Sequence, residues 1–139
     1  MKNTKAVING KQYTVATEKE ISSLVIDVTG NRVTDRMVSE HALKYAFGFG
    51  SNVLFNFIVT VKLSQDYDLT KNLVGAEEES VICSVKDITV EIVHQVIGKD
   101  ESLDRIEEAF DRAMKATKAL RAQLAEVERV IIPVEQLRF

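Results

Sequence analysis

Apolar residues alternate with polar ones on both sides of a tight-turn signal near the N-terminus. The alternating segments cover residues 5–8 and 11–16, and Asn9-Gly10 lies between them. An Asn-Gly pair readily supplies the two positive-φ residues of a type I′ turn, whose twist matches that of two antiparallel strands. The pattern therefore predicts an N-terminal β-hairpin.

The next segment carries the signals of a helix. Thr17 and Glu20 have the spacing of a capping box, and Gly30 suits the left-handed residue that often ends a helix. Apolar residues between them recur at helical spacing: Ile21, Leu24, Val25 and Val28. We expect a short helix over residues 18–29. A strand over residues 24–28 is the alternative, because β-branched residues are frequent there.

A second short helix is expected after the first, followed by a strand. Thr34 is a candidate N-cap and Gly48 a candidate end of the helix. The residues that would share its buried face are Met37, Val38, His41, Ala42 and Tyr45. Over residues 52–63 the apolar period changes to two, at Val53, Phe55, Phe57, Val59, Val61 and Leu63. Such alternation is typical of a half-buried strand.

The chain then becomes polar before two runs of β-branched residues. Residues 64–80 predict a long connection with little regular structure. Residues 81–85 and 88–97 predict one long strand or two consecutive strands, although the apolar residues of the second run would also suit a helical face. With strands here, the protein is expected to be α+β, with the hairpin, two short helices, an antiparallel sheet and one long C-terminal helix.

The C-terminal third carries an apolar seam with a period of 3.5 residues. The seam residues are Leu103, Ile106, Phe110, Ala113, Thr117, Leu120, Leu124, Val127 and Ile131. Acidic residues lie in the first turn, where the helix dipole favours them. This predicts one long helix that ends at Pro133.

This helix is expected to pair with the same helix of another subunit. Residues 103–131 would extend about 42 Å as a helix, whereas a compact chain of this length is about 37 Å across. The alternative is a helix that lies across its own sheet, because such helices also carry an apolar stripe. The chain is expected to form one domain, residues 1–139, with a body (1–100), an oligomerisation helix (101–132) and a tail (133–139).

Composition and charge are those of an ordinary globular protein. The 139 residues are 45% hydrophobic and 28% charged, with a formal net charge of −3. The absence of a large basic stripe argues against nucleic acid or an anionic membrane as partner. No signal-peptide core or membrane-spanning apolar run is evident. With a single cysteine there can be no internal disulfide, and a cytoplasmic location is expected.

No residue pattern points to catalysis or to a metal. Cys83 lies in an apolar run, which predicts a core cysteine. His41 and His94 lie far apart in amphipathic segments, which does not suit a zinc site or a general base with its partners. The acidic stretch after residue 65 resembles a calcium-binding loop in spacing, but Lys71 stands where that loop needs glycine. A non-enzymatic protein without cofactor or metal is expected.

The candidate ligand site combines two segments. Phenylalanines that stack on a planar group and polar groups that bond to it cluster after the expected second helix: Phe47, Phe49, Ser51 and Asn52. Arg105 and Arg112, seven residues apart, share one face of the long helix and would clamp a phosphate or carboxylate. The alternatives are a tight turn with two core phenylalanines, and arginines that pair with nearby carboxylates.

Several functions remain open. The leading expectation is a non-enzymatic, homo-oligomeric binding protein whose sheet or loops contact a partner protein. The alternative is a protein that sequesters a small nucleotide-type ligand near the subunit boundary. A sheet-bearing body with a long dimerising helix is similar in outline to phage-encoded proteins that capture cyclic-nucleotide immune signals, although no motif of this chain carries the likeness. A structural component of a viral particle, or an enzyme whose site is assembled from distant residues, are further alternatives.

Overall fold

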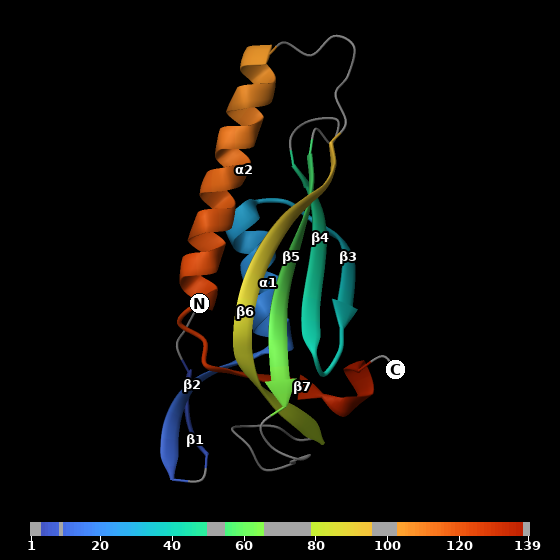
Figure 1. Cartoon of the computed structure of the whole chain (residues 1–139). Helices are drawn as coiled ribbons and strands as arrows, with labels where there is room; N and C mark the ends of the chain where they lie inside the picture. The colour runs from blue at the N-terminus through green and yellow to red at the C-terminus, as the bar shows by residue number, and fades with distance from the viewer. Residues whose placement is uncertain (1–3, 9, 50–54, 66–78, 96–102, 138–139) are drawn as a thin grey trace.

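The computed structural model is a mixed α+β protein built on one large sheet. It describes residues 4–8, 10–49, 55–65, 79–95 and 103–137 (Figure 1). The strands in chain order are β1 (Thr4–Ile8), β2 (Lys11–Thr17), β3 (Val33–Val38), β4 (Ala42–Phe49), β5 (Phe55–Gln65), β6 (Ser80–Gln95) and β7 (Arg129–Pro133). The helices are α1 (Glu18–Thr29), α2 (Leu103–Leu124) and a short 3₁₀ turn, η1 (Val134–Gln136). The expected α+β class is confirmed.

The seven strands lie in the order β1-β2-β7-β6-β5-β4-β3. All neighbours pair antiparallel except β2 and β7, which run parallel. The 16-residue strand β6 joins two parts of the sheet, because its first residues pair with β7 and most of the remainder pairs with β5. In Figure 1, β3 to β6 stand upright, while β1, β2 and β7 lie toward the lower end of the molecule.

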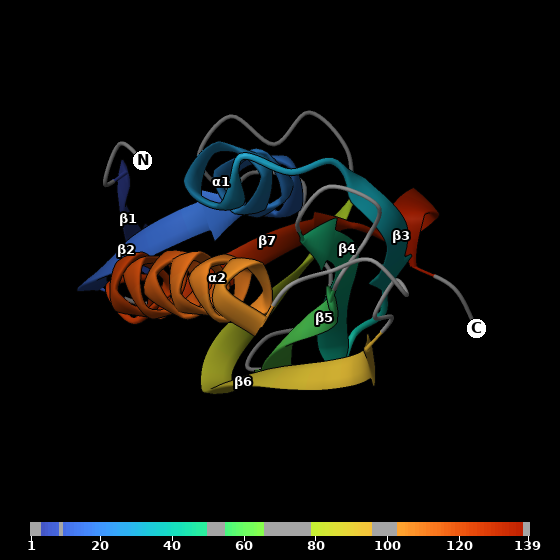
Figure 2. The same ribbon diagram turned by 90° about the horizontal axis from the view of Figure 1, so that it is seen from above.

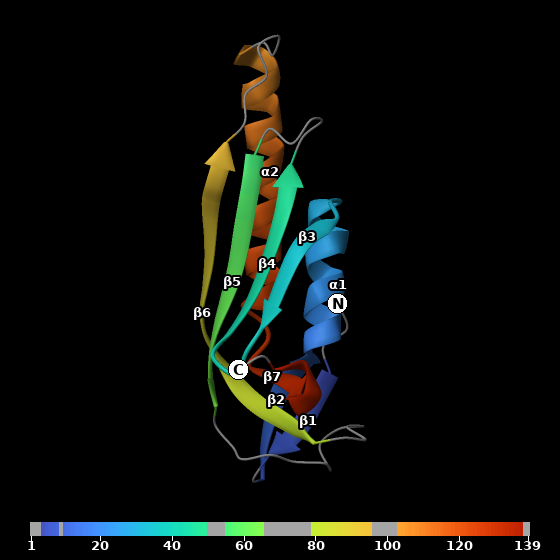
Figure 3. The same ribbon diagram turned by 90° about the vertical axis from the view of Figure 1, so that its right-hand side faces the viewer.

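Both helices cover the same face of the upright strands. Figures 2 and 3 show α1 and α2 on one side of β3 to β6, and the two helices contact each other. The core lies between these layers, and its largest fully buried side chains include Ile21, Leu43, Tyr45, Phe47, Phe57, Leu120, Leu124 and Ile132. The sheet therefore buries one face under the helices, as an α+β fold requires.

The N-terminal predictions are confirmed. Gly10 has φ 80°, as a type I′ turn needs, and β1 pairs antiparallel with β2. The Thr17 hydroxyl accepts from the Glu20 backbone N–H at 3.2 Å, and the Glu20 carboxylate accepts from the Thr17 N–H. Helix α1 ends at Gly30 in the left-handed conformation. Local signals were sufficient here because turn and caps are set by neighbouring residues.

The predicted second helix is wrong, since that segment forms the strands β3 and β4. The buried residues alternate as Leu43, Tyr45 and Phe47, which is the period of a strand, and they pair along β5. Met37 and His41, counted on the supposed helical face, are exposed. The antiparallel pairing on both sides of β4 outweighs the helical spacing of the apolar residues.

The predicted strands over residues 52–63 and 81–97 are confirmed as β5 and β6 for the described residues. β6 is one continuous strand, so the helical alternative for its second half does not apply to Ile88–Gln95. Its register against β5 shifts twice, once between Lys62 and Leu63 and once between Asn56 and Phe57. Each shift is a β-bulge, which bends and twists the strand.

The predicted long C-terminal helix is wrong in its extent. α2 has 22 residues and ends at Leu124, and the chain then turns and returns to the sheet as β7. Val127 lies in the turn, Ile131 lies in β7, and Pro133 is the last residue of β7 rather than a helix stop. The β-branched residues Val130 and Ile131 gain strand partners in both β2 and β6, and Ile132 gains one in β6, which outweighs the continued 3.5-residue spacing.

Most of the seam on α2 is buried within its own chain. Ala109, Ala113, Thr117, Leu120 and Leu124 are all buried in the isolated protomer. Ile106 is half-buried and Phe110 keeps 37% of its surface exposed, while the side chain of Leu103 lies outside the described residues. α2 packs mainly against α1 and to a lesser extent against β6 of its own chain. Residues 129–133, expected to belong mainly to the oligomerisation helix, instead form β7 between β2 and β6.

Candidate functional site

The structure places Phe47 in the core rather than in a ligand site. Its side chain is fully buried and stacks on Phe57 with ring centroids 5.7 Å apart and planes 15° from parallel. Phe49 is the last residue of β4, and its side chain lies outside the described residues, as do Ser51 and Asn52. The alternative reading of a core phenylalanine is thus confirmed for Phe47.

The two predicted arginines are not brought to Phe47. Arg105 and Arg112 are both exposed on α2, whereas Phe47 has no surface that a ligand could contact. The expected cluster of stacking and clamping groups is therefore not assembled from these three residues.

The structure describes the side chains of Cys83 and His41 but not that of His94. Cys83 is fully buried, and its Sγ lies 3.7 Å from the carbonyl oxygen of Glu40, as expected of a core cysteine. His41 is exposed, with its Nε2 3.2 Å from a carboxylate oxygen of Glu40. The side chain of His94 lies outside the described residues. In the part of the chain that the structure describes, no group of three or more potential metal ligands gathers.

The best candidate site is a groove between the bend of β6 and the C-terminal half of α2, which we call the β6–α2 groove. Lys62 pairs with Asp87 and Leu63 with Val85, so Lys86 is the extra residue of a β-bulge. Bulges often lie next to functional sites, where they redirect a side chain. The Val85 N–H donates to the carbonyl of Glu128 at 3.2 Å, which fixes the bend of β6 against the turn after α2.

The groove has the size of a small-molecule site. It holds about 460 Å³ and is shallow and largely open to solvent. Its lining consists of Val85, Lys86, Asp87, Ile88, Arg121, Ala122 and Ala125. Val85 and Ile88 are half-buried, and the two alanines leave room beside them. Ligand sites are usually of this volume and combine apolar walls with a few charged groups.

Two cations enter the groove from different elements. Lys86 comes from β6 and Arg121 from α2, and both side chains are exposed. Neither forms an ion pair or a hydrogen bond within the described residues. The Asp87 carboxylate, in contrast, accepts from the backbone N–H of Ile88 at 2.9 Å. An ammonium and a guanidinium at one groove form an arrangement that suits a phosphate or carboxylate.

The sequence contains little signal for this groove. Lys86 differs from other surface lysines only in being the extra residue of a bulge. The bulge follows from the register between β5 and β6, which the sequence alone does not show. Arg121 lies in the last turn of α2, where a cation also stabilises the helix dipole. Their proximity follows from how β6 bends beneath α2, which no local pattern encodes.

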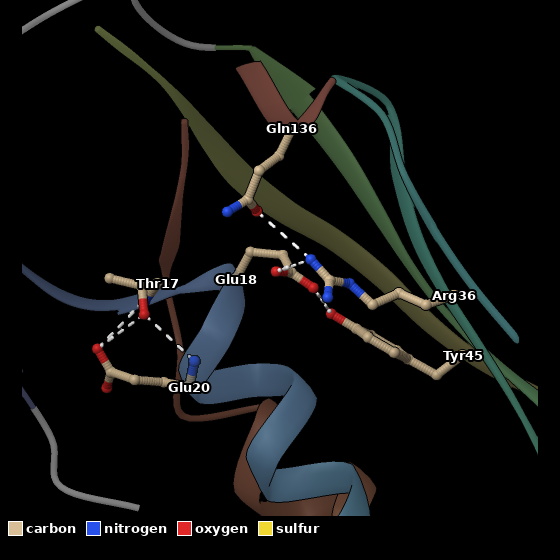
Figure 4. Close-up of polar contacts among 6 residues, drawn as sticks. All are labelled: Thr17, Glu18, Glu20, Arg36, Tyr45 and Gln136. Atoms are coloured by element: carbon tan, nitrogen blue, oxygen red, sulfur yellow. Dashed lines mark hydrogen bonds and ion pairs between the residues drawn. The ribbon is translucent and has the colours of Figure 1, made fainter. Parts of the chain in front are cut away.

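A second polar cluster lies at the start of α1 (Figure 4). Glu18 is fully buried, and its Oε2 lies 2.8 Å from an Nη2 of Arg36 while its Oε1 accepts from the hydroxyl of Tyr45 at 2.9 Å. Arg36 also reaches Oε1 of Gln136 at 3.5 Å. The cluster therefore joins α1, β3, β4 and η1.

The contacts of this cluster indicate a role in stability. Burial of the ring and the neighbouring Glu18 carboxylate raise the pKa of Tyr45 above its ordinary value of 10.0. Each carboxylate oxygen of Glu18 already accepts from a protein donor. A buried carboxylate needs such partners because its desolvation is costly. We assign the cluster to holding the helix against the sheet.

Neither helix in the described part of the chain is both long and apolar enough to cross a bilayer. Comparison of the chain with protein-family models, with curated proteins and with solved structures found no match in any of the three.

Proposed function

We propose that the protein is a non-enzymatic binding protein that holds a small anionic ligand of nucleotide size in the β6–α2 groove. The observation that supports it is the pair of cations, Lys86 and Arg121, at a groove of about 460 Å³ with apolar walls. This is the sequestering function that the sequence left as an alternative, at a different site from the one predicted.

The charged and the apolar side chains of the groove would contact different parts of the ligand. Arg121 can donate two parallel hydrogen bonds to a phosphate or carboxylate, while the ammonium of Lys86 acts as a compact charge. Val85 and Ile88 offer apolar surface to the uncharged part of the ligand. Asp87 lines the same groove and would repel a further negative group, so a ligand with one anionic end suits it best.

The first test is native mass spectrometry of freshly purified protein, before and after mild denaturation. Extra mass of nucleotide size that is lost on denaturation supports the proposal. The second test is calorimetric titration with adenosine monophosphate as the probe. Because both cations would contact the anionic group, Arg121→Glu and Lys86→Glu should each weaken binding by at least about tenfold, or about 1.4 kcal/mol.

Two matched variants make the titration decisive. Lys44→Glu makes the same charge change at an exposed position of β4 and should leave binding unchanged. Arg112→Glu tests the arginine that the sequence singled out. Binding that is lost in Arg112→Glu but kept in Arg121→Glu would refute the groove. Protein that carries no extra mass and does not bind the probe would favour the other expectation, a macromolecular partner.

A further inference from the structure

The solvent side of α2 carries a regular stripe of charges. Its members recur at alternating steps of four and three residues and are all exposed: Asp104, Glu108, Asp111, Lys115, Lys118 and Ala122. The first three are acidic and the next two basic, so the sign changes once, near the middle of the helix. Steps of four and three keep residues on one face of a helix over several turns.

Among the described residues, no interaction uses the charges of this stripe. In the part of α2 that the structure describes, none of its charged members forms an ion pair or a hydrogen bond. Figures 1 and 2 show that no labelled helix or strand covers the side of α2 that points away from the sheet. Among the described residues, this face of α2 therefore has no partner.

The helix dipole does not account for the whole stripe. It favours acidic residues in the first turn and basic residues in the last, and its effect fades beyond those turns. Asp111 and Lys115 lie near the middle of the 22-residue helix, where the dipole gives no preference between the two signs. Asp111 and Lys115 also have the i,i+4 spacing of a favourable pair within one helix, but no ion pair joins them among the described residues.

We propose that this stripe pairs antiparallel with the same stripe of a second copy of the chain. A two-fold axis at the level of residue 113 brings Asp111 opposite Lys115 of the other copy and Glu108 opposite its Lys118. Symmetry repeats each pair, because both copies present the same surface. Parallel pairing would instead place like charges opposite one another, which is repulsive.

The proposed dimer is expected to be weak and to depend on ionic strength. Ala122 continues the stripe beyond the charges, and its small side chain lets a neighbouring helix approach closely. Exposed ion pairs are individually weak and are screened by salt, so the dimer is expected to be favoured at low ionic strength and to dissociate as salt rises. Ala122 also lines the β6–α2 groove, but Asp111 and Lys115, whose charges carry the pairing, do not, so the inference does not rest on the proposed ligand.

The test uses charge reversal on the full-length protein, followed by sedimentation equilibrium at low and high salt. Asp111→Lys and Lys115→Asp each create repulsion at two symmetry-related contacts and should raise the dissociation constant at least about tenfold. The double variant, Asp111→Lys with Lys115→Asp, restores opposite charges only in the antiparallel arrangement and should recover the wild-type constant. Lys44→Asp, on β4, is the control for net charge.

The outcomes separate clearly. Loss in both single variants with recovery in the double variant establishes the antiparallel pair. A wild-type protein that is monomeric at low salt overturns the proposal, as does a dimer that none of the variants affects. Because each single variant also places like charges four residues apart within the helix, circular dichroism of each variant serves as the control for folding.

Discussion

The hydroxyl of Tyr45 on β4 donates a 2.9 Å hydrogen bond to the carboxylate of Glu18, at the start of α1. Both side chains are fully buried, and they lie 27 residues apart in the sequence. The contact fixes the N-terminus of the helix against the middle of the sheet, so it should influence stability more than any exposed charge. The predictions on Glu18 and Tyr45 follow from this pair.

Replacing Glu18 with glutamine should lower the free energy of unfolding by about 1–3 kcal/mol, because the amide nitrogen cannot accept from Arg36 or Tyr45 and one buried donor loses its partner. Urea denaturation measures the change. Glu91→Gln makes the same replacement at an exposed position of β6 and should shift stability by less than about 0.5 kcal/mol. Equal effects in the two variants would contradict the assigned role of Glu18.

Stability should fall more steeply above about pH 10 in the wild type than in Tyr45→Phe. Burial and the Glu18 carboxylate raise the pKa of Tyr45 in the folded state. Between about pH 10, where the unfolded tyrosine ionises, and the raised pKa, the unfolded state binds fewer protons. The stability that folding gains from protonated Tyr45 is therefore fully present below about pH 10 and is lost as the pH rises above that value. Urea midpoints across that range, compared between the two proteins, provide the measurement.

Thr17→Ala should cost about 1 kcal/mol of stability, because it removes the oxygen that accepts from the Glu20 backbone N–H at the start of α1. Circular dichroism during denaturation would report both helicity and stability. Ser23→Ala lies on the exposed side of the same helix and should be neutral or slightly stabilising, since alanine favours helices. A loss in Ser23→Ala as large as in Thr17→Ala would show that the cap is not the cause.

Leu120→Ala should destabilise each protomer by about 2–5 kcal/mol, because Leu120 is fully buried within its own chain. The loss should be the same at low and high protein concentration, as measured by urea denaturation at two concentrations. A residue at a subunit interface would give a loss that depends on concentration. A loss that depends on protein concentration would indicate that the seam of α2 is an interface between copies of the chain.

The sequence predicts those elements that depend on neighbouring residues. The turn at Gly10, the capping box at Thr17 and Glu20 and the end of α1 at Gly30 are each determined within a few positions, and all three lie where expected. The alternation of β5 is equally local. These patterns need no knowledge of the rest of the fold.

The errors lie where distant partners decide the outcome. Tyr45 and Phe47 have helical and strand alternatives that differ little until β3 and β5 pair with β4. Ile131 continues a 3.5-residue seam, but it gains strand partners in both β2 and β6. The β6–α2 groove depends in the same way on a bulge at Lys86 that only the register with β5 creates.

The parallel pairing of β2 with β7 has a consequence for how the chain acquires its fold. The hairpin of β1 and β2 meets the rest of the sheet only through β7, where Thr17 pairs with Ile131. Closing so long a loop is entropically costly and slow compared with forming local contacts. During translation, the hairpin must therefore wait for nearly the whole chain before it can join the sheet. Until then, the edges of β2 and β6 that β7 will cover lack a strand partner and are open to association with other chains.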